Sequence, residues 1–177
     1  MTSKEEKLFQ DRMSRHIDEL RWLYMELYDN GSMFAELCQK LYDYAAERSA
    51  ALKKRDLERE ENPDWYKSNS LTGMMMYIDN FAGNLNGLRE KLPYVEQAGV
   101  NLLHLMPFLD TVAERSDGGY AVADFRKVRA DLGTMEDLEQ LADVCHKKGI
   151  SLCMDFVMNH TSQDHEWAQR ARQGDGE

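Results

Sequence analysis

The chain has 177 residues, of which 42% are hydrophobic and 31% charged, and its formal net charge is -10. This composition is typical of a soluble globular protein, and the excess of acidic groups argues against a nucleic-acid partner because phosphates would be repelled. The first residues are charged and no apolar run is long enough for a signal peptide or membrane span, so we expect a cytoplasmic protein with no membrane partner.

Three cysteines occur in the chain, namely Cys38, Cys145 and Cys153. Their number is odd, no two of them form a Cys-x-x-Cys pair, and each falls on the apolar face of a predicted helix or strand. We therefore expect buried free thiols in a protein of a reducing compartment.

The first part of the chain has the periodicity of helices. Apolar residues recur at steps of three or four from Lys4 to Tyr28, which predicts an amphipathic helix. Asn30-Gly31 is expected to end this helix, and Ser32 is expected to cap a second one. The second helix is predicted to run on into the charged stretch 53–61 and to stop at Asn62-Pro63.

After Pro63 the pattern changes to short apolar runs separated by helical segments. Such runs are typical of strands that are buried on both faces of a parallel sheet. The runs are Met74–Ile78, Asn101–Met106 and Ile150–Val157. The order strand, helix, strand, helix, strand predicts an α/β fold with a parallel βαβαβ arrangement.

Two helices are expected between these strands. The first has its apolar side from Leu85 to Val95 and ends at Gly99, with Pro93 either kinking the helix or marking its first turn. The second is predicted to begin at Thr134, with Asp137 three residues further on as in a capping box, and to end at residues 147–149.

A long connection, residues 107–133, follows the second predicted strand, where about 2 to 6 residues are usual. It contains Ser116-Asp117-Gly118-Gly119-Tyr120, in which two glycines allow a sharp turn that presents an acid and an aromatic ring side by side. Long loops at this position are usually functional, but an ordinary Asp-Gly turn is the alternative interpretation.

The end of the third predicted strand carries Asp155, Asn159 and His160. In parallel α/β proteins, ligands meet the sheet at such strand ends. The same residues also suit a structural role, in which Asp155 caps the following turn and His160 satisfies a backbone carbonyl group. The spacing alone leaves both interpretations open.

Metal and cofactor sites have little support in the sequence. His160, Asp164, His165 and Glu166 crowd together, but the residues after His165 lack the second histidine of the His-Glu-x-x-His zinc motif. The glycines that follow the first predicted strand do not form the Gly-x-Gly-x-x-Gly dinucleotide fingerprint. We expect neither a metal nor a cofactor.

Six motifs along the chain together resemble one known superfamily. They are Asp64-Trp65, Tyr77-Ile78-Asp79 with Phe81-Ala82-Gly83, His104-Leu105-Met106-Pro107, Ser116–Val122, Leu132-Gly133-Thr134 and Asp155–Ser162. In this order and at these spacings they resemble the α-amylase superfamily of glycoside hydrolases, and within it the amylosucrases most. The likeness covers about residues 62 to 170 densely, and the ordered set is far more specific than any single motif.

The resemblance implies a helical N-terminal domain over residues 1–70, followed at 71–177 by the first three β/α units of a (β/α)8 TIM barrel, which is left incomplete. It also implies a retaining glucosyl transfer. A carboxylate nucleophile attacks the anomeric carbon of sucrose, a second carboxylic acid protonates the departing fructose, and the glucosyl group passes to an α-glucan or to water. The implied partner is therefore a small molecule, sucrose or another α-glucoside.

Five residues acquire roles from the resemblance. Asp117 matches the acid at the floor of the sugar pocket, Tyr120 would stack on the sugar ring, and His160 would hydrogen-bond a glucosyl hydroxyl group. Asp155 and Asn159 would support the site without attacking the sugar. These roles suit the chemistry, since apolar sugar faces favour aromatic rings and hydroxyl groups favour charged partners.

The sequence also departs from the family pattern. Arg129-Ala130 replaces the Asn-Pro or Asp-Pro that usually precedes the Leu-Gly-Thr turn. In the family the nucleophile and the acid/base come from later strands, so this chain alone is expected to be inactive, and a companion chain could carry the rest of the barrel. The alternatives are a fragment of another sucrose or α-glucoside hydrolase or isomerase, and a non-catalytic glucoside-binding module.

Overall fold

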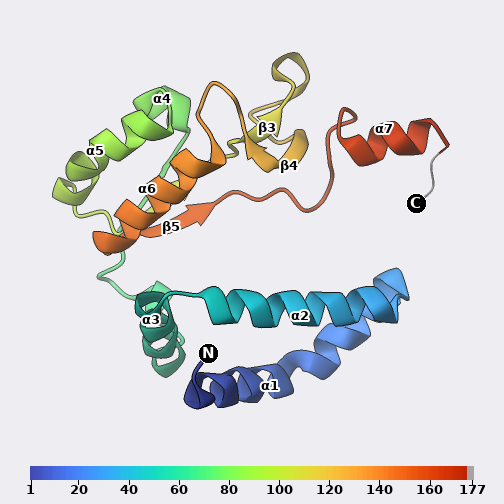
Figure 1. Cartoon of the computed structure of the whole chain (residues 1–177). Coiled ribbons are helices and arrows are strands. Elements are labelled where there is room, and N and C mark those ends of the chain that lie inside the picture. Colours follow the sequence, from blue (N-terminus) through green and yellow to red (C-terminus); the bar gives the residue numbers. More distant parts are fainter. Residues whose placement is uncertain (175–177) are drawn as a thin grey trace. The chain divides into compact units, whose positions relative to one another are not determined.

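The computed structural model describes residues 1–174 of the chain (Figure 1). The chain divides into two compact units, Met1–Trp65 and Tyr66–Glu177. None of the helices within residues 1–174 combines the length and the apolar character that crossing a bilayer requires. Each unit has its own internal packing.

The first unit consists of the helices α1 (Ser3–Tyr28), α2 (Gly31–Glu47) and α3 (Ala50–Glu61). The helix predicted over 4–28 is confirmed as α1, and Thr2 and Glu5 form a capping box at its start. Aromatic side chains pack between helices of this unit, as in the edge-to-face contact of the Phe9 and Tyr42 rings at 5.4 Å.

Two predictions about the second helix were wrong. Asn30, and not Ser32, caps α2, because its side-chain oxygen accepts a 3.1 Å hydrogen bond from the backbone N–H of Met33. The helix does not continue into the charged stretch, since it ends at Glu47 and Ser49 caps the separate helix α3. Arg48 stabilises this break through two hydrogen bonds to the carboxylate of Asp56, at 2.6 and 2.8 Å.

A three-stranded parallel sheet lies at the centre of the second unit. Its strands are β1 (Gly73–Met76), β2 (Leu102–Leu105) and β5 (Ser151–Met154), in the spatial order β1-β2-β5. The predicted parallel βαβαβ arrangement is confirmed. The first strand is shorter than predicted, because Ile78 already belongs to the short helix α4 (Ile78–Ala82).

Helices α5 (Leu85–Gln97) and α6 (Met135–Lys147) connect the strands and contribute much of the core (Figure 1). The fully buried side chains include Leu88 and Leu92 of α5 and Leu141 of α6. The predicted capping box of α6 is confirmed. Pro93 lies inside α5, so it does not mark the first turn. A last helix, α7 (Glu166–Arg172), follows the third strand.

The expectation that both faces of the strands are buried was wrong. Leu103 and Leu105 on one face of β2 are fully buried, whereas Met75 of β1 is 64% exposed. The helices α5 and α6 cover one face of the sheet within this unit, which leaves the alternate side chains uncovered. For the same reason Cys153 is exposed. Cys38 is half-buried, so the prediction of buried thiols is confirmed for Cys145 alone among the three.

The long connection after β2 was predicted to be a loop. It instead contains a second, antiparallel sheet. Strand β3 (Leu109–Thr111) pairs with β4 (Val122–Val128), and the register shifts twice within β3. A short 3-10 turn, Ala113–Arg115, lies between the two strands. The connecting turn of this hairpin lies beside the ends of the parallel strands, since Gly118 packs against the hydroxyl group of Tyr77 after β1 and Tyr120 hydrogen-bonds Asp155 after β5.

Candidate functional site

Tyr120 and Asp155 form the central contact of the predicted site. Tyr120 lies just before β4, and Asp155 follows the last residue of β5. The phenolic O–H of Tyr120 donates a 2.8 Å hydrogen bond to Oδ2 of Asp155. This bond to a carboxylate raises the pKa of Tyr120, because the protonated hydroxyl group is favoured beside a negative charge.

His160 joins the same group through its ring. Its Nε2 lies 3.1 Å from the backbone carbonyl oxygen of Tyr120, and its Nδ1 lies 3.2 Å from Nδ2 of Asn159. A neutral ring protonated on Nε2 satisfies both contacts, since Nε2 then donates to the carbonyl and Nδ1 accepts from the amide. His160 thus satisfies a backbone carbonyl, as the structural interpretation expected, and that carbonyl belongs to another residue of the predicted site.

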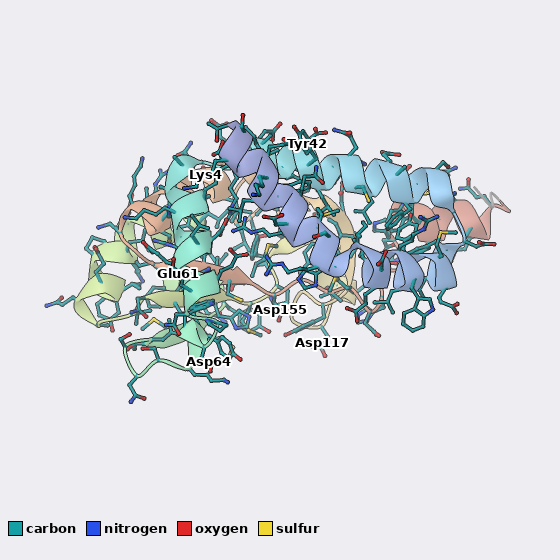
Figure 2. All side chains as sticks on the ribbon, turned by 90° about the horizontal axis from the view of Figure 1, so that it is seen from below. Lys4, Tyr42, Glu61, Asp64, Asp117 and Asp155 are labelled. Carbon is teal, nitrogen blue, oxygen red and sulfur yellow. The ribbon has the colours of Figure 1, made fainter. Side chains whose placement is uncertain are left out.

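Asp117 is presented at the turn and is exposed. Its backbone oxygen accepts a 3.2 Å hydrogen bond from the N–H of Tyr120, which closes the turn. Gly118 and Gly119 both have positive φ, and a Cβ atom on Gly119 would lie 2.9 Å from the backbone oxygen of Pro107. Within residues 1–174 no hydrogen bond links the Asp117 carboxylate to the other predicted residues. Figure 2 labels Asp117 on this turn and Asp155 at the end of β5.

A cleft of about 720 Å³ borders these residues. It is lined by Tyr77, Asp79, Asn80, Asp110, Thr111, Ser116, Gly118, Gly119, Arg129, Ala130 and Asp131. The cleft lies beside the predicted site because Gly118 and Gly119 are the residues between Asp117 and Tyr120. Its volume lies within the range of small-molecule sites.

Sequence reasoning did not bring these cleft residues together. The sequence did single out three of them. Tyr77 and Asp79 belong to one of the six motifs, and Arg129 belongs to the dipeptide that departs from the family pattern. Nothing in the local pattern pointed to Asp110 or Thr111, because the antiparallel pairing of β3 and β4 was not foreseen.

One guanidinium group, that of Arg129, forms ion pairs with two carboxylates of this cleft. Arg129 binds Asp131 through two hydrogen bonds of 2.7 and 3.0 Å, and it binds Asp79 at 2.6 Å. The bonds to Asp131 and then to Asp79 raise the pKa of Arg129, and the same guanidinium lowers the pKa of Asp131. Arg129 and Asp131 are therefore ionised at neutral pH.

The residues after His160 anchor the site to β4. The N–H of Ser162 donates a 2.8 Å hydrogen bond to the carbonyl oxygen of Val122, and Asp164 pairs with Arg115 at 2.8 Å. Nδ1 of His165 accepts a hydrogen bond from the N–H of Trp167. In the part of the chain that the structure describes, no three His, Cys, Asp or Glu side chains converge closely enough to hold a metal ion.

The chemistry of the site suits a polyhydroxylated ligand. An exposed acid, an aromatic ring and an imidazole group are gathered at the end of a parallel sheet, beside a cleft whose lining includes several polar and charged side chains. Carboxylates accept hydrogen bonds from hydroxyl groups, and an aromatic face packs against the apolar face of a sugar ring.

Comparison with known proteins gives a family match over most of the chain. The family model described as "Alpha amylase, catalytic domain" matches residues 34–177. The trehalose synthase/amylase TreS of Mycolicibacterium smegmatis is 48% identical over 90 residues, which are 51% of this chain and 15% of that protein. The oligo-1,6-glucosidase IMA5 of Saccharomyces cerevisiae is 37% identical over 118 residues, which are 63% of this chain and 20% of that protein.

Solved structures of two enzymes are also similar to this chain. The trehalose-6-phosphate hydrolase TreA of Bacillus licheniformis has a TM-score of 0.57 and 30% identity, covering 63% of this chain and 21% of that one. The trehalulose synthase MutB of Pseudomonas mesoacidophila has a TM-score of 0.53 and 33% identity, covering 58% and 19%. The chain thus spans about a fifth or less of the length of these relatives.

Proposed function

The chain belongs to the alpha-amylase family of glycoside hydrolases, and on this basis we propose that it forms the part of an α-glucoside-acting enzyme that contacts one glucosyl unit. The proposal rests on one observation above all, the network in which Tyr120 binds Asp155 and His160 binds the Tyr120 carbonyl. This network holds a loop residue and a strand-end residue together through the protein's own hydrogen bonds. Pre-organisation of this kind lowers the cost of binding.

We assign the contacts residue by residue. The exposed Asp117 accepts hydrogen bonds from glucosyl hydroxyl groups, the ring of Tyr120 packs on the sugar, and His160 contacts a further hydroxyl group. Asp155 and Asn159 act indirectly, because each orients one of these groups through a hydrogen bond. Residues 1–70 form the helical N-terminal domain in this proposal, and 71–177 the first part of the barrel.

The finer proposal is sucrose as substrate and an amylosucrase-like transfer of its glucosyl group to an α-glucan or to water. The six ordered motifs support it. A solved structure of a variant of the trehalulose synthase MutB, 32% identical to this chain and described as a complex with the substrate sucrose, supports the choice of sucrose but not the transfer. The reaction needs two carboxylates about 5 Å apart across the sugar. Because these would come from later strands, we propose that this chain alone does not turn sucrose over. The separate companion chain has no support in the comparisons.

A second candidate is a hydrolase or isomerase of sucrose or of another α-glucoside. The names of the relatives favour it, since they include trehalose synthases, a trehalose-6-phosphate hydrolase and an oligo-1,6-glucosidase. A third candidate is a glucoside-binding module without catalysis, which would use the same contact residues.

The test is a titration of the ¹⁵N-labelled chain with sucrose, trehalose and isomaltose, followed by NMR. We expect weak binding, with amide shifts centred on residues 117–120 and 160, and no release of fructose. The variant Tyr120→Ala should lose the shifts, whereas Tyr94→Ala, which removes an exposed tyrosine of the same unit, should keep them.

The relative affinities then separate sucrose from other α-glucosides as the substrate. Tighter binding of sucrose supports sucrose as the substrate, which an amylosucrase-like enzyme shares with a sucrose hydrolase or isomerase. Tighter binding of trehalose or isomaltose supports the second candidate alone. A folded chain whose amides move for none of the three sugars would refute the contact role. Fructose release by the pure chain would refute the statement that this chain is inactive alone.

A further inference from the structure

Arg129 occupies a position at which the chain departs from its family. The resemblance leads one to expect Asn-Pro or Asp-Pro before the Leu-Gly-Thr turn, where this chain has Arg129-Ala130. Proline restricts the backbone to a narrow range of φ, and alanine does not. The segment after β4 therefore lacks a local constraint that the family pattern would supply.

The side chain of Arg129 supplies a constraint of another kind. Its contact with Asp131 is local, two residues along the chain, but its contact with Asp79 joins residues 50 positions apart. Asp79 lies in the first turn of α4, directly after β1, so this ion pair connects the segment after β4 with the segment after β1. We call the Arg129–Asp79 contact the cross-cleft pair.

The cross-cleft pair leads to the candidate sugar-contact turn in two steps. Asp79 and Tyr77 belong to one turn of backbone, in which the N–H of Phe81 donates to the carbonyl of Tyr77. The Tyr77 hydroxyl group in turn packs against Gly118, so closely that a Cβ atom there would lie 2.9 Å from it. Fixing Asp79 therefore fixes the surface against which the turn with Asp117 and Tyr120 rests.

The geometry points to arginine in particular for this task. The planar guanidinium binds one carboxylate through two parallel hydrogen bonds and still has a donor for another. The Arg129 side chain is only 22% exposed, which protects its ion pairs from solvent more than those of an open surface.

We propose that Arg129 is a positioning residue that sets the width of the cleft and the placement of the Asp117–Tyr120 turn through the cross-cleft pair. The inference rests on the proposed function, because it assigns Arg129 to the affinity of that same site. Arg129 need not touch the sugar. Its effect passes through Asp79, Tyr77 and Gly118.

The test compares variants of the 177-residue chain by NMR well below their melting temperatures. Arg129→Gln and Asp79→Asn each remove the cross-cleft pair, so both should shift the amide signals of residues 118–120. We expect both to weaken sucrose binding by about fivefold, the size expected when one partly screened ion pair no longer holds the geometry. Arg129→Lys should lie between the native chain and Arg129→Gln, since an ammonium group can hold one carboxylate but not both in the same geometry.

The matched control is Glu96→Gln, which removes an ion pair of 2.5 Å between Glu96 of α5 and Lys148, two residues that do not line the cleft. It should change neither the turn amides nor the affinity. If Arg129→Gln does not fold, Asp79→Asn decides alone, since its side chain is 39% exposed.

The outcomes separate this inference from the proposed function. Unchanged turn amides in Asp79→Asn and Arg129→Gln, even with lowered melting temperatures, would overturn the positioning role and leave sugar contact intact. Equal effects of Glu96→Gln would overturn it as well. In a further outcome, neither the native chain nor any variant binds sucrose, but Asp79→Asn still shifts the amide signals of the turn. That result would refute the proposed function and support the positioning of the turn by the cross-cleft pair.

Discussion

The Tyr120 hydroxyl group and the Asp155 carboxylate are joined by a 2.8 Å hydrogen bond between residues 35 positions apart. The bond connects the turn of the antiparallel hairpin with the end of the third parallel strand. It therefore couples the placement of an aromatic ring to the placement of a strand-end acid, and both residues belong to the proposed sugar-contact group.

This bond should be visible in the ionisation of Tyr120 in the native chain. The pKa of Tyr120 lies above its ordinary value of 10.0, so the bond stabilises the fold below pH 10 and this contribution is lost as the pH rises through the elevated pKa. The difference between ultraviolet titrations of the native chain and Tyr120→Phe should show one tyrosine with a midpoint above 10. A midpoint at or below 10 would contradict the hydrogen bond.

Tyr120→Phe should also separate the ring from its hydroxyl group in sugar binding. We expect an affinity for sucrose roughly threefold lower, because the ring that packs on the sugar remains but is no longer held by Asp155. Calorimetric or NMR titration measures this. An affinity loss as large as that of Tyr120→Ala would show that the hydroxyl group itself is the main contact.

Gly119→Ala should damage the turn severely. The residue has a φ of +89°, and the new methyl group would lie 2.9 Å from both the Cβ and the backbone oxygen of Pro107. We expect a loss of about 2 to 4 kcal/mol in the free energy of unfolding of the second unit. Gly73→Ala is the control, since its Cβ would meet only ordinary contacts of 3.8 Å and longer. Similar chemical denaturation curves for the two variants would refute the steric account.

Thr134→Ala should destabilise α6 in a way that depends on pH. The variant removes the side-chain cap and should cost about 1 kcal/mol at pH 7. Hydrogen bonds from the backbone and then the side chain of Thr134 lower the pKa of Asp137 below 3.8, so ionised Asp137 stabilises the fold above that pH. The contribution is lost as the pH falls through the lowered pKa. The difference in melting temperature between native chain and variant should shrink in acid, whereas Thr72→Ala, an exposed change, should have little effect at either pH.

The three thiols should differ in their rate of alkylation. Burial raises the pKa of Cys145 to about 11, so at pH 8 roughly one molecule in a thousand carries the reactive thiolate there. Cys153 is exposed and should be labelled first, Cys38 should follow, and Cys145 should be labelled only after unfolding. Mass spectrometry of peptides after brief treatment with iodoacetamide measures the order. Rapid labelling of Cys145 in the folded chain would contradict its burial.

Local patterns were sufficient for the elements whose signals are contiguous. The helix over 4–28, the capping box of Thr134 and Asp137 and the parallel order of the three strands were all predicted from periodicity and capping residues. The break at Arg48 and the β3–β4 pair were missed. The break at Arg48 is stabilised by an ion pair with Asp56. The β3–β4 sheet depends on the pairing of two segments, each of which has only a weak strand signal in its own sequence.

For the candidate site, the sequence by itself determined which residue types stand at the turn and at the strand end, because glycine-dependent turns and buried parallel strands leave local signatures. It did not determine their partners. That Tyr120 binds Asp155, that His160 reaches the Tyr120 carbonyl and that Arg129 spans to Asp79 were decided only by the tertiary structure. A hydrogen bond or ion pair depends on distances of a few ångströms, and the folding of separate segments against one another, not their spacing in the chain, sets those distances.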